Sequence, residues 1–122
     1  MSMSNNKINV VLAGRPKMMS EVLRKMIQKQ PDMDVATEVY DPIELLIIIK
    51  QTPADVAIIT PVNPTTKTKI CKRLLQEFPL LKILTISADG KRAVLYQNDR
   101  TDVHIMEPSE AGICNTIRKS LR

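Results

Sequence analysis

The chain has 122 residues, enough for one domain with a single hydrophobic core. Hydrophobic residues make up 43% of it, which excludes a disordered chain, and aromatic residues only 2%, so the core must consist of aliphatic side chains and methionine. The formal net charge of +5 permits an acidic partner, but so few aromatic residues make a poor platform for stacking single-stranded nucleic acid.

Local patterns bear on the location of the chain and on its cysteines. No apolar run approaches the roughly 20 residues of a membrane span, so we expect no membrane association. The start MSMSNNK lacks the apolar segment of a signal peptide, and we expect a cytoplasmic protein. Cys71 and Cys114 fall in helical patterns and are interpreted as buried free thiols, with a disulfide or a metal site as the alternative.

The predicted elements alternate between strand and helix after a polar tail over residues 1–7. Strands are indicated by short apolar or alternating runs, and helices by apolar residues that recur every three or four positions. In chain order the elements are a strand at 8–13, a helix at 17–29, a strand at 33–39, a helix at 41–50, a strand at 55–60, a helix at 70–78, a strand at 81–87, a short and weakly patterned helix at 91–97, a strand at 102–106 and a helix at 110–121.

Capping residues mark two of the predicted helix starts. Asp41 can cap the second helix, with Pro42 at a favourable first position and Glu44 three residues after the cap. Ser109 can cap the last helix in the same way.

Strands that alternate with helices predict a parallel sheet with helices on both faces. At this length we expect a flavodoxin-like, doubly wound α/β domain over residues 8–122, with five parallel strands in the order 2-1-3-4-5. Function in such sheets collects where the strands end. The loops concerned begin at Ala13, Thr60, Ser87 and Glu107, and after Val39.

Over residues 7–122 the sequence resembles the receiver domain of two-component response regulators, closest to receivers that precede a helix-turn-helix output domain in transcriptional regulators. The stretches that carry the resemblance are INVVLAGRPKMMSEVLRKMIQKQPDMDVATEV, PADVAIITPVNP, EFPLLKILTISA and VHIMEPSEAGICNTIRKSL. A receiver takes a phosphoryl group onto an aspartate. Two further acidic residues hold the magnesium ion that the transfer needs, and a lysine neutralises the phosphoryl oxygens.

The resemblance places this phosphorylation site on residues that lack its chemistry. The acidic pair falls on Ala13 and Gly14, and the phosphoacceptor aspartate on Thr60. Ser87 matches the hydroxyl position, whereas the lysine position falls on Glu107, which reverses the charge. Two unit charges 4 Å apart interact by roughly 4 kcal/mol at an effective dielectric constant of about 20, so this reversal alone opposes phosphate binding.

Some other positions match the receiver pattern, and others depart from it. Pro64, Ala88 and Pro108 fit it, and the switch aromatic falls on His104. The segment 87–107 is also shorter than the family pattern, which bears on the helix expected there. His104 is either a pH-sensitive group or filler on a half-exposed strand.

We therefore expect a pseudo-receiver, which keeps the receiver fold, binds no magnesium or other cofactor, and is not an enzyme. It would act in two-component signalling or transcription regulation by contact with a protein partner or a second copy. The resemblance implies the face formed by 91–122 as the contact surface, with the helix at 17–29 as the second option. A DNA-binding domain is the part we expect next to it in a longer protein.

Several alternatives stay open. A small-molecule sensor could use the vacated pocket lined by Ala13, Gly14, Thr60, Ser87 and Glu107. Thr60 could be modified by a Ser/Thr kinase, and Glu107 could contact Thr60 or Ser87 in place of a phosphate. Basic residues at 17–29, at 67–73 and at the end of the chain form either a solvated face or a docking surface for an acidic protein or nucleic acid.

Overall fold

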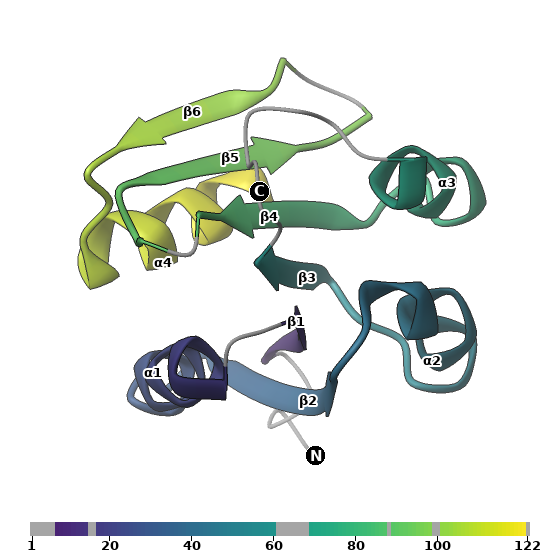
Figure 1. Cartoon of the computed structure of the whole chain (residues 1–122), viewed down its shortest axis with the longest axis horizontal. Coiled ribbons are helices and arrows are strands. Elements are labelled where there is room, and N and C mark those ends of the chain that lie inside the picture. Colours follow the sequence, from purple (N-terminus) through teal and green to yellow (C-terminus); the bar gives the residue numbers. More distant parts are fainter. Residues whose placement is uncertain (1–6, 15–16, 61–68, 88, 99–100, 122) are drawn as a thin grey trace.

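A six-stranded sheet forms the centre of the computed structural model, which describes residues 7–14, 17–60, 69–87, 89–98 and 101–121 (Figure 1). The strands are β1 (Ile8–Gly14), β2 (Met33–Val39), β3 (Val56–Thr60), β4 (Lys82–Ile86), β5 (Arg92–Tyr96) and β6 (Val103–Met106). The helices are α1 (Lys17–Gln28), the 3-10 turn η2 (Pro42–Glu44), α2 (Leu45–Gln51), α3 (Lys69–Glu77) and α4 (Glu110–Ser120).

The predicted class, a doubly wound α/β fold, is confirmed. The strand order is β2-β1-β3-β4-β5-β6, and β1, β2, β3 and β4 pair in parallel. Figure 1 shows α1 and α4 on one face of the sheet and α2 and α3 on the other. The carboxyl ends of the parallel strands therefore meet at one edge, as predicted. Residues 1–6 of the predicted tail lie outside the described residues.

The prediction of five parallel strands with a helix over 91–97 is wrong. This segment forms β5, which pairs antiparallel with β4 on one side and with β6 on the other. A tight turn makes the pairing possible: the Gly90 N–H donates to the Ser87 carbonyl at 2.9 Å, and the Ser87 N–H donates to the Arg92 carbonyl at 3.0 Å. Gly90 has a φ of +73°, which glycine adopts at little cost.

Burial explains why β5 is stable as a strand. Residues 93–96 read AVLY, and all four are at most 3% exposed because both faces of the sheet are covered there. Their side chains alternate between the two core layers: Ala93 and Leu95 pack with α1 and α4, and Val94 and Tyr96 with α2 and α3. An amphipathic helix could bury only one side of this run.

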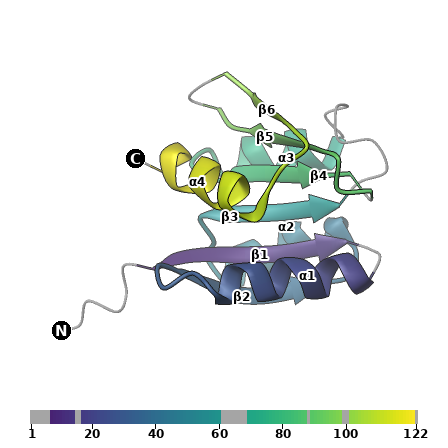
Figure 2. The same cartoon turned by 90° about the vertical axis from the view of Figure 1, so that its left-hand side faces the viewer.

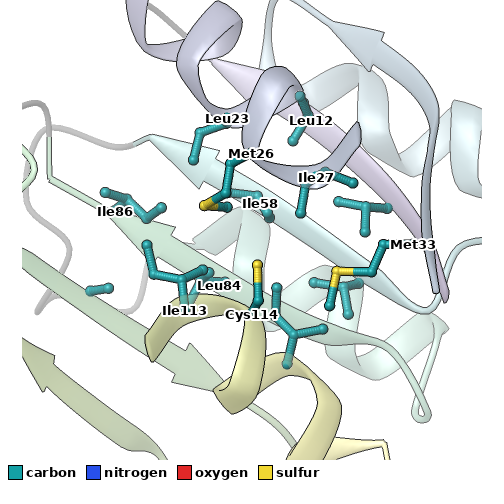
Figure 3. Packing of buried hydrophobic residues seen from close by; sticks show 14 of the residues in the cluster. Leu12, Leu23, Met26, Ile27, Met33, Ile58, Leu84, Ile86, Ile113 and Cys114 are labelled. Carbon is teal, nitrogen blue, oxygen red and sulfur yellow. The ribbon is translucent and has the colours of Figure 1, made fainter. Parts of the chain in front are cut away.

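The core layer under α1 and α4 is aliphatic and sulfur-rich (Figure 3). Met26 and Met33 are each 2% exposed, so these methionines fill the core, as predicted. The labelled members of this layer are Leu12, Leu23, Met26, Ile27, Met33, Ile58, Leu84, Ile86, Ile113 and Cys114. The second layer contains Leu45, Ile49, Cys71, Leu74 and Leu75 from α2 and α3.

Two further predictions are confirmed. Cys71 and Cys114 are buried free thiols, and burial raises the pKa of the Cys114 thiol. Ser109 caps α4, since its Oγ accepts a hydrogen bond from the Gly112 N–H at 3.0 Å. Among the described helices, none combines the length and the apolar character needed to cross a membrane.

An ion pair joins the end of α4 to the turn before β2. The Arg118 guanidinium donates to both carboxylate oxygens of Asp32, at 2.7 and 2.9 Å, and also to the Gln30 side-chain oxygen at 2.7 Å. The hydrogen bonds from Arg118 hold the pKa of Asp32 below its ordinary value. This bidentate contact therefore links residues 86 positions apart in the sequence.

Replacement of Asp32 by asparagine should lower the free energy of unfolding at pH 7 by at most about 1 kcal/mol, because both side chains are partly exposed. The folded pKa is depressed, so the stabilisation is complete above the ordinary carboxyl pKa of about 3.9 and is lost as the pH falls through the folded value. Urea unfolding of wild type and Asp32→Asn between pH 7 and pH 2 measures this difference.

The control is Asp34→Asn, which removes an acidic residue whose oxygen lies 3.8 Å from the Lys7 amine. It should cost less at pH 7. A difference between wild type and Asp32→Asn that stays constant down to pH 2 would contradict the role of the carboxylate charge.

Candidate functional site

The carboxyl edge of the sheet brings Gly14 and Thr60 together. They are register partners at the ends of β1 and β3, as the sequence predicts. Gly14 has a φ of +126°, and a Cβ built on it would lie well inside contact distance of Thr60 Oγ1. Thr60 thus packs directly against the backbone of Gly14, in the space that a side chain at position 14 would need.

Ala13 points away from this edge. It is 4% exposed and belongs to the apolar layer that also contains Leu45 and Ile49 of α2. A carboxylate at position 13 would enter this apolar layer unless the strand shifted, and its charge would be costly to bury there. Both positions that the resemblance assigns to metal-binding carboxylates therefore lack room or a polar environment for one.

The Ser87 hydroxyl takes part in the turn between β4 and β5. Its Oγ donates to the Asp89 carboxylate at 2.5 Å and accepts a hydrogen bond from the Arg92 N–H at 3.2 Å. The same carboxylate accepts the Lys91 N–H at 3.0 Å. Ser87 is only 8% exposed. Its hydroxyl thus stabilises the hairpin. To bind a phosphoryl group, the hydroxyl would have to give up these hydrogen bonds.

The pKa of the Asp89 carboxyl reflects its role as the hydrogen-bond acceptor in this turn. The hydrogen bond from the Ser87 hydroxyl, followed by that from the Lys91 N–H, lowers the pKa of the Asp89 carboxyl. The carboxylate is consequently ionised at neutral pH and stays committed to the turn. Sequence reasoning assigned no role to Asp89, although Asp-Gly between two apolar runs is a strong hairpin signal.

Glu107 does not join the other predicted residues. It follows β6, and β5 lies between β6 and β4, so two strand spacings, about 10 Å, separate it from the Ser87 strand. Its N–H donates to the Lys91 carbonyl at 2.8 Å, the last hydrogen bond at this end of the β5–β6 pair, and its φ is 49°. The structure therefore does not bring Glu107 into contact distance of Ser87 or of Thr60, which lies a further strand away.

His104, at the switch-aromatic position, lies on β6 at the open edge of the sheet. It is exposed and faces Val94 across the strand pair. Pro64, Ala88 and Lys67 lie outside the described residues.

A small hollow lies beside Gly14 at this edge. Its volume is about 220 Å³, and it is lined by Gly14, Ser20, Glu38, Val39 and Tyr40. Of the five predicted pocket residues it contains only Gly14. Within the described ranges, no three His, Cys, Asp or Glu side chains are grouped so that they could hold a metal ion.

Many of the basic side chains form ion pairs on the surface. The pairs are Arg24–Glu38 at 2.9 Å, Arg73–Glu77 at 2.7 Å, Lys50–Glu77 at 3.6 Å and Lys29–Glu110 at 3.7 Å. Lys69 and Lys72 remain exposed on α3. A docking role for this basic surface stays a prediction.

No family model matches the sequence. The fold is similar to that of receiver domains of response regulators, which are among the solved structures that match it. The isolated receiver domain of RcsB from Salmonella enterica serovar Typhimurium is 22% identical, with a TM-score of 0.57 over 67% of this chain and 62% of that one. The signal receiver domain of NarL from Mycobacterium tuberculosis is 23% identical, with a TM-score of 0.57 and 68% of each chain covered.

A curated relative matches more of the chain. A protein-glutamate methylesterase/protein-glutamine glutaminase from Chromohalobacter salexigens is 27% identical over 114 residues, which are 91% of this chain and 32% of that protein. The chain thus spans about a third of the length of this relative. Together these similarities establish the receiver-like fold.

Replacement of Gly14 by alanine should destabilise the protein by about 2–4 kcal/mol, because the new Cβ meets Thr60 Oγ1 and the backbone there is unfavourable for other residues. In a Thr60→Ala background the cost should fall by at least about 1 kcal/mol, since the hydroxyl and methyl are gone. Urea unfolding of wild type, both single variants and the double variant completes the cycle. Equal costs of Gly14→Ala in the two backgrounds would contradict the contact.

Proposed function

We propose that this chain is a regulatory domain that keeps the receiver fold, works without phosphorylation and acts by protein–protein contact. The insertion of β5 between β4 and β6 is the observation that carries the proposal. It separates the two strands that a receiver places side by side, and it commits the Ser87 hydroxyl to a turn. In this proposal the domain has no magnesium requirement and no enzymatic activity of its own.

The chemistry of the edge supports this proposal. Phosphoryl transfer is catalysed almost entirely by positioning and by neutralising negative charge, so it depends on the acceptor, the metal ligands and a nearby cation. A threonine hydroxyl is a poor acceptor without a base or a metal ion to activate it. At this edge Thr60 faces Gly14. The position of the receiver lysine holds Glu107, which follows β6, a strand about three strand spacings, or about 14 Å, from the strand of Thr60.

The surface formed by residues 91–122 supports a docking role better than the described side chains of α1 do. The edge strand β6 presents unpaired backbone groups, together with Val103 at 38% and Met106 at 67% exposure. Among residues 20–28, the part of α1 whose side chains the structure describes, the comparable side chain is Val22, which is 56% exposed. Among the neighbours, RcsB is described as two dimers bound to two parallel DNAs and as a response regulator–DNA complex. For this chain we propose contact through β6, with a DNA-binding domain as a partner.

A small-molecule sensor in the vacated pocket is less well supported. Drug-sized ligand pockets usually have volumes of about 300–1,000 Å³. The hollow at Gly14 has about 220 Å³ and includes neither Thr60 nor Ser87.

The proposal predicts that beryllofluoride with magnesium, which mimics a phosphoryl group on a receiver, changes neither the structure nor the binding of this domain. The first readout is the ¹H–¹⁵N NMR spectrum, in which the amides of Gly14, Thr60 and Ser87 should not shift. The second is quantitative capture of proteins from a lysate of the cells that encode the chain. Met106→Lys should lose the captured partner, because it places a charge on the exposed edge of β6.

Val22→Lys is the matched control, since it makes the same kind of change at a similarly exposed site on α1. It should retain the partner. Saturable shifts of the Gly14, Thr60 and Ser87 amides on addition of beryllofluoride would contradict phosphorylation independence. Equal loss of capture in both variants, or in neither, would contradict the proposed surface.

A further inference from the structure

Gln97 holds a buried acceptor that the described part of the chain does not satisfy. It directly follows β5 and is 6% exposed, so its amide is more than nine-tenths buried. Its Nε2 donates to the Thr101 carbonyl at 3.0 Å, which fixes the orientation of the amide, because a flipped amide would place two oxygens face to face. Its Oε1 is the one buried side-chain N or O atom among the described residues without a hydrogen-bond partner.

The unsatisfied amide lies in the wall of a groove between α4 and the β5–β6 pair. The groove has a volume of about 420 Å³, within the usual range for small-molecule sites. Leu95 and Val103 supply apolar lining, and Thr101, Thr116 and Ser120 supply polar lining. These residues lie at the end of β5, the start of β6 and the end of α4, at the edge of the sheet opposite to Gly14 and Thr60.

The extra strand explains why this groove exists. Six strands span about 24 Å, at about 4.8 Å per spacing, whereas two helices side by side cover about 20 Å. On the face of α1 and α4, the cover therefore runs out toward β6, as Figure 2 shows, with β6 extending beyond α4. Ile105 still packs against the core, but Val103 remains 38% exposed beside the groove.

The polar lining offers mainly acceptors. The Thr116 hydroxyl donates its hydrogen to the Gly112 carbonyl at 2.8 Å, and the Ser120 hydroxyl donates to the Ile117 carbonyl at 2.7 Å. Each can therefore only accept further hydrogen bonds, like Gln97 Oε1. Lys119 also lines the groove and disfavours a positively charged ligand. The complementary ligand is neutral, has an apolar body, and carries an N–H or O–H donor.

We propose that this groove is a binding site for a small neutral molecule that donates a hydrogen bond from an amide or hydroxyl group to Gln97 Oε1. The apolar part of the ligand lies on Val103, with the buried Leu95 forming the floor behind it. The site is independent of the vacated phosphorylation edge. It lies directly beneath the β6 surface, so a bound ligand contacts two elements of the 91–122 face.

Two pairs of matched compounds test the proposal by ¹H–¹⁵N NMR titration of the whole chain. Benzamide and benzyl alcohol carry a donor, whereas acetophenone and anisole have similar shapes and only acceptors. The donors should shift the amides of Leu95, Val103 and 116–120 with millimolar dissociation constants. The acceptor-only partners should bind about tenfold more weakly, the effect of about one hydrogen bond to a neutral group.

Variants locate the interaction. Gln97→Leu should abolish the preference for donors, whereas Gln76→Leu, the same change at an exposed position on α3, should retain it. Val103→Trp keeps Gln97 and fills the groove, so it should abolish binding of all four compounds even if Gln97→Leu does not fold. The proposal is overturned if no compound shifts the groove amides up to its solubility limit, if donors and acceptors bind equally, or if Val103→Trp binds as wild type does.

Discussion

The turn at Ser87–Arg92 is the contact on which the rest of the molecule depends. Four hydrogen-bonding groups converge there: the Ser87 hydroxyl, the Asp89 carboxylate, and the backbone N–H groups of Lys91 and Arg92. Together with the positive φ of Gly90, they reverse the chain within a few residues. The following apolar run must then lie antiparallel beside β4. Segment 92–96 consequently becomes a strand between β4 and β6 rather than a helix that covers a face of the sheet.

Two consequences of this turn concern function. At the carboxyl edge, the turn engages the Ser87 hydroxyl in hydrogen bonds and places β5 between β4 and β6. Glu107 therefore lies apart from Ser87 and Thr60. At the opposite edge, the wider sheet extends past α4 and leaves the groove at Gln97. The proposed independence from phosphorylation and the proposed ligand site in the groove thus have the same structural basis.

The sequence predicts most of the fold because the relevant signals are local. Short apolar runs bounded by proline or glycine identify β1, β3 and β4, and Ser109 identifies the start of α4. The run at 91–97 was misassigned because periodicity cannot distinguish a short, fully buried strand from a helical turn. The Asp89–Gly90 pair carried the missing information, and the short segment between Ser87 and Glu107 was consistent with it.

The candidate site could be predicted only in part, for a related reason. The register of neighbouring parallel strands follows from their pattern, so the pairing of Gly14 with Thr60 was predictable. The distance from Ser87 to Glu107 depends on which strands are neighbours, and that depends on the misassigned segment. The groove at Gln97 had no sequence signal, because an unsatisfied amide is defined by its surroundings rather than by its type.

The position of residues 92–96 is the central claim, and nuclear Overhauser effects in the uniformly labelled chain test it most directly. The account predicts cross-strand effects between Leu84 and Leu95 and between Thr85 and Val94 on one side of β5. On its other side it predicts effects between Val94 and His104. Medium-range effects between residues three apart throughout 91–97, together with direct contacts between β4 and β6, would instead establish a helix there and contradict the account.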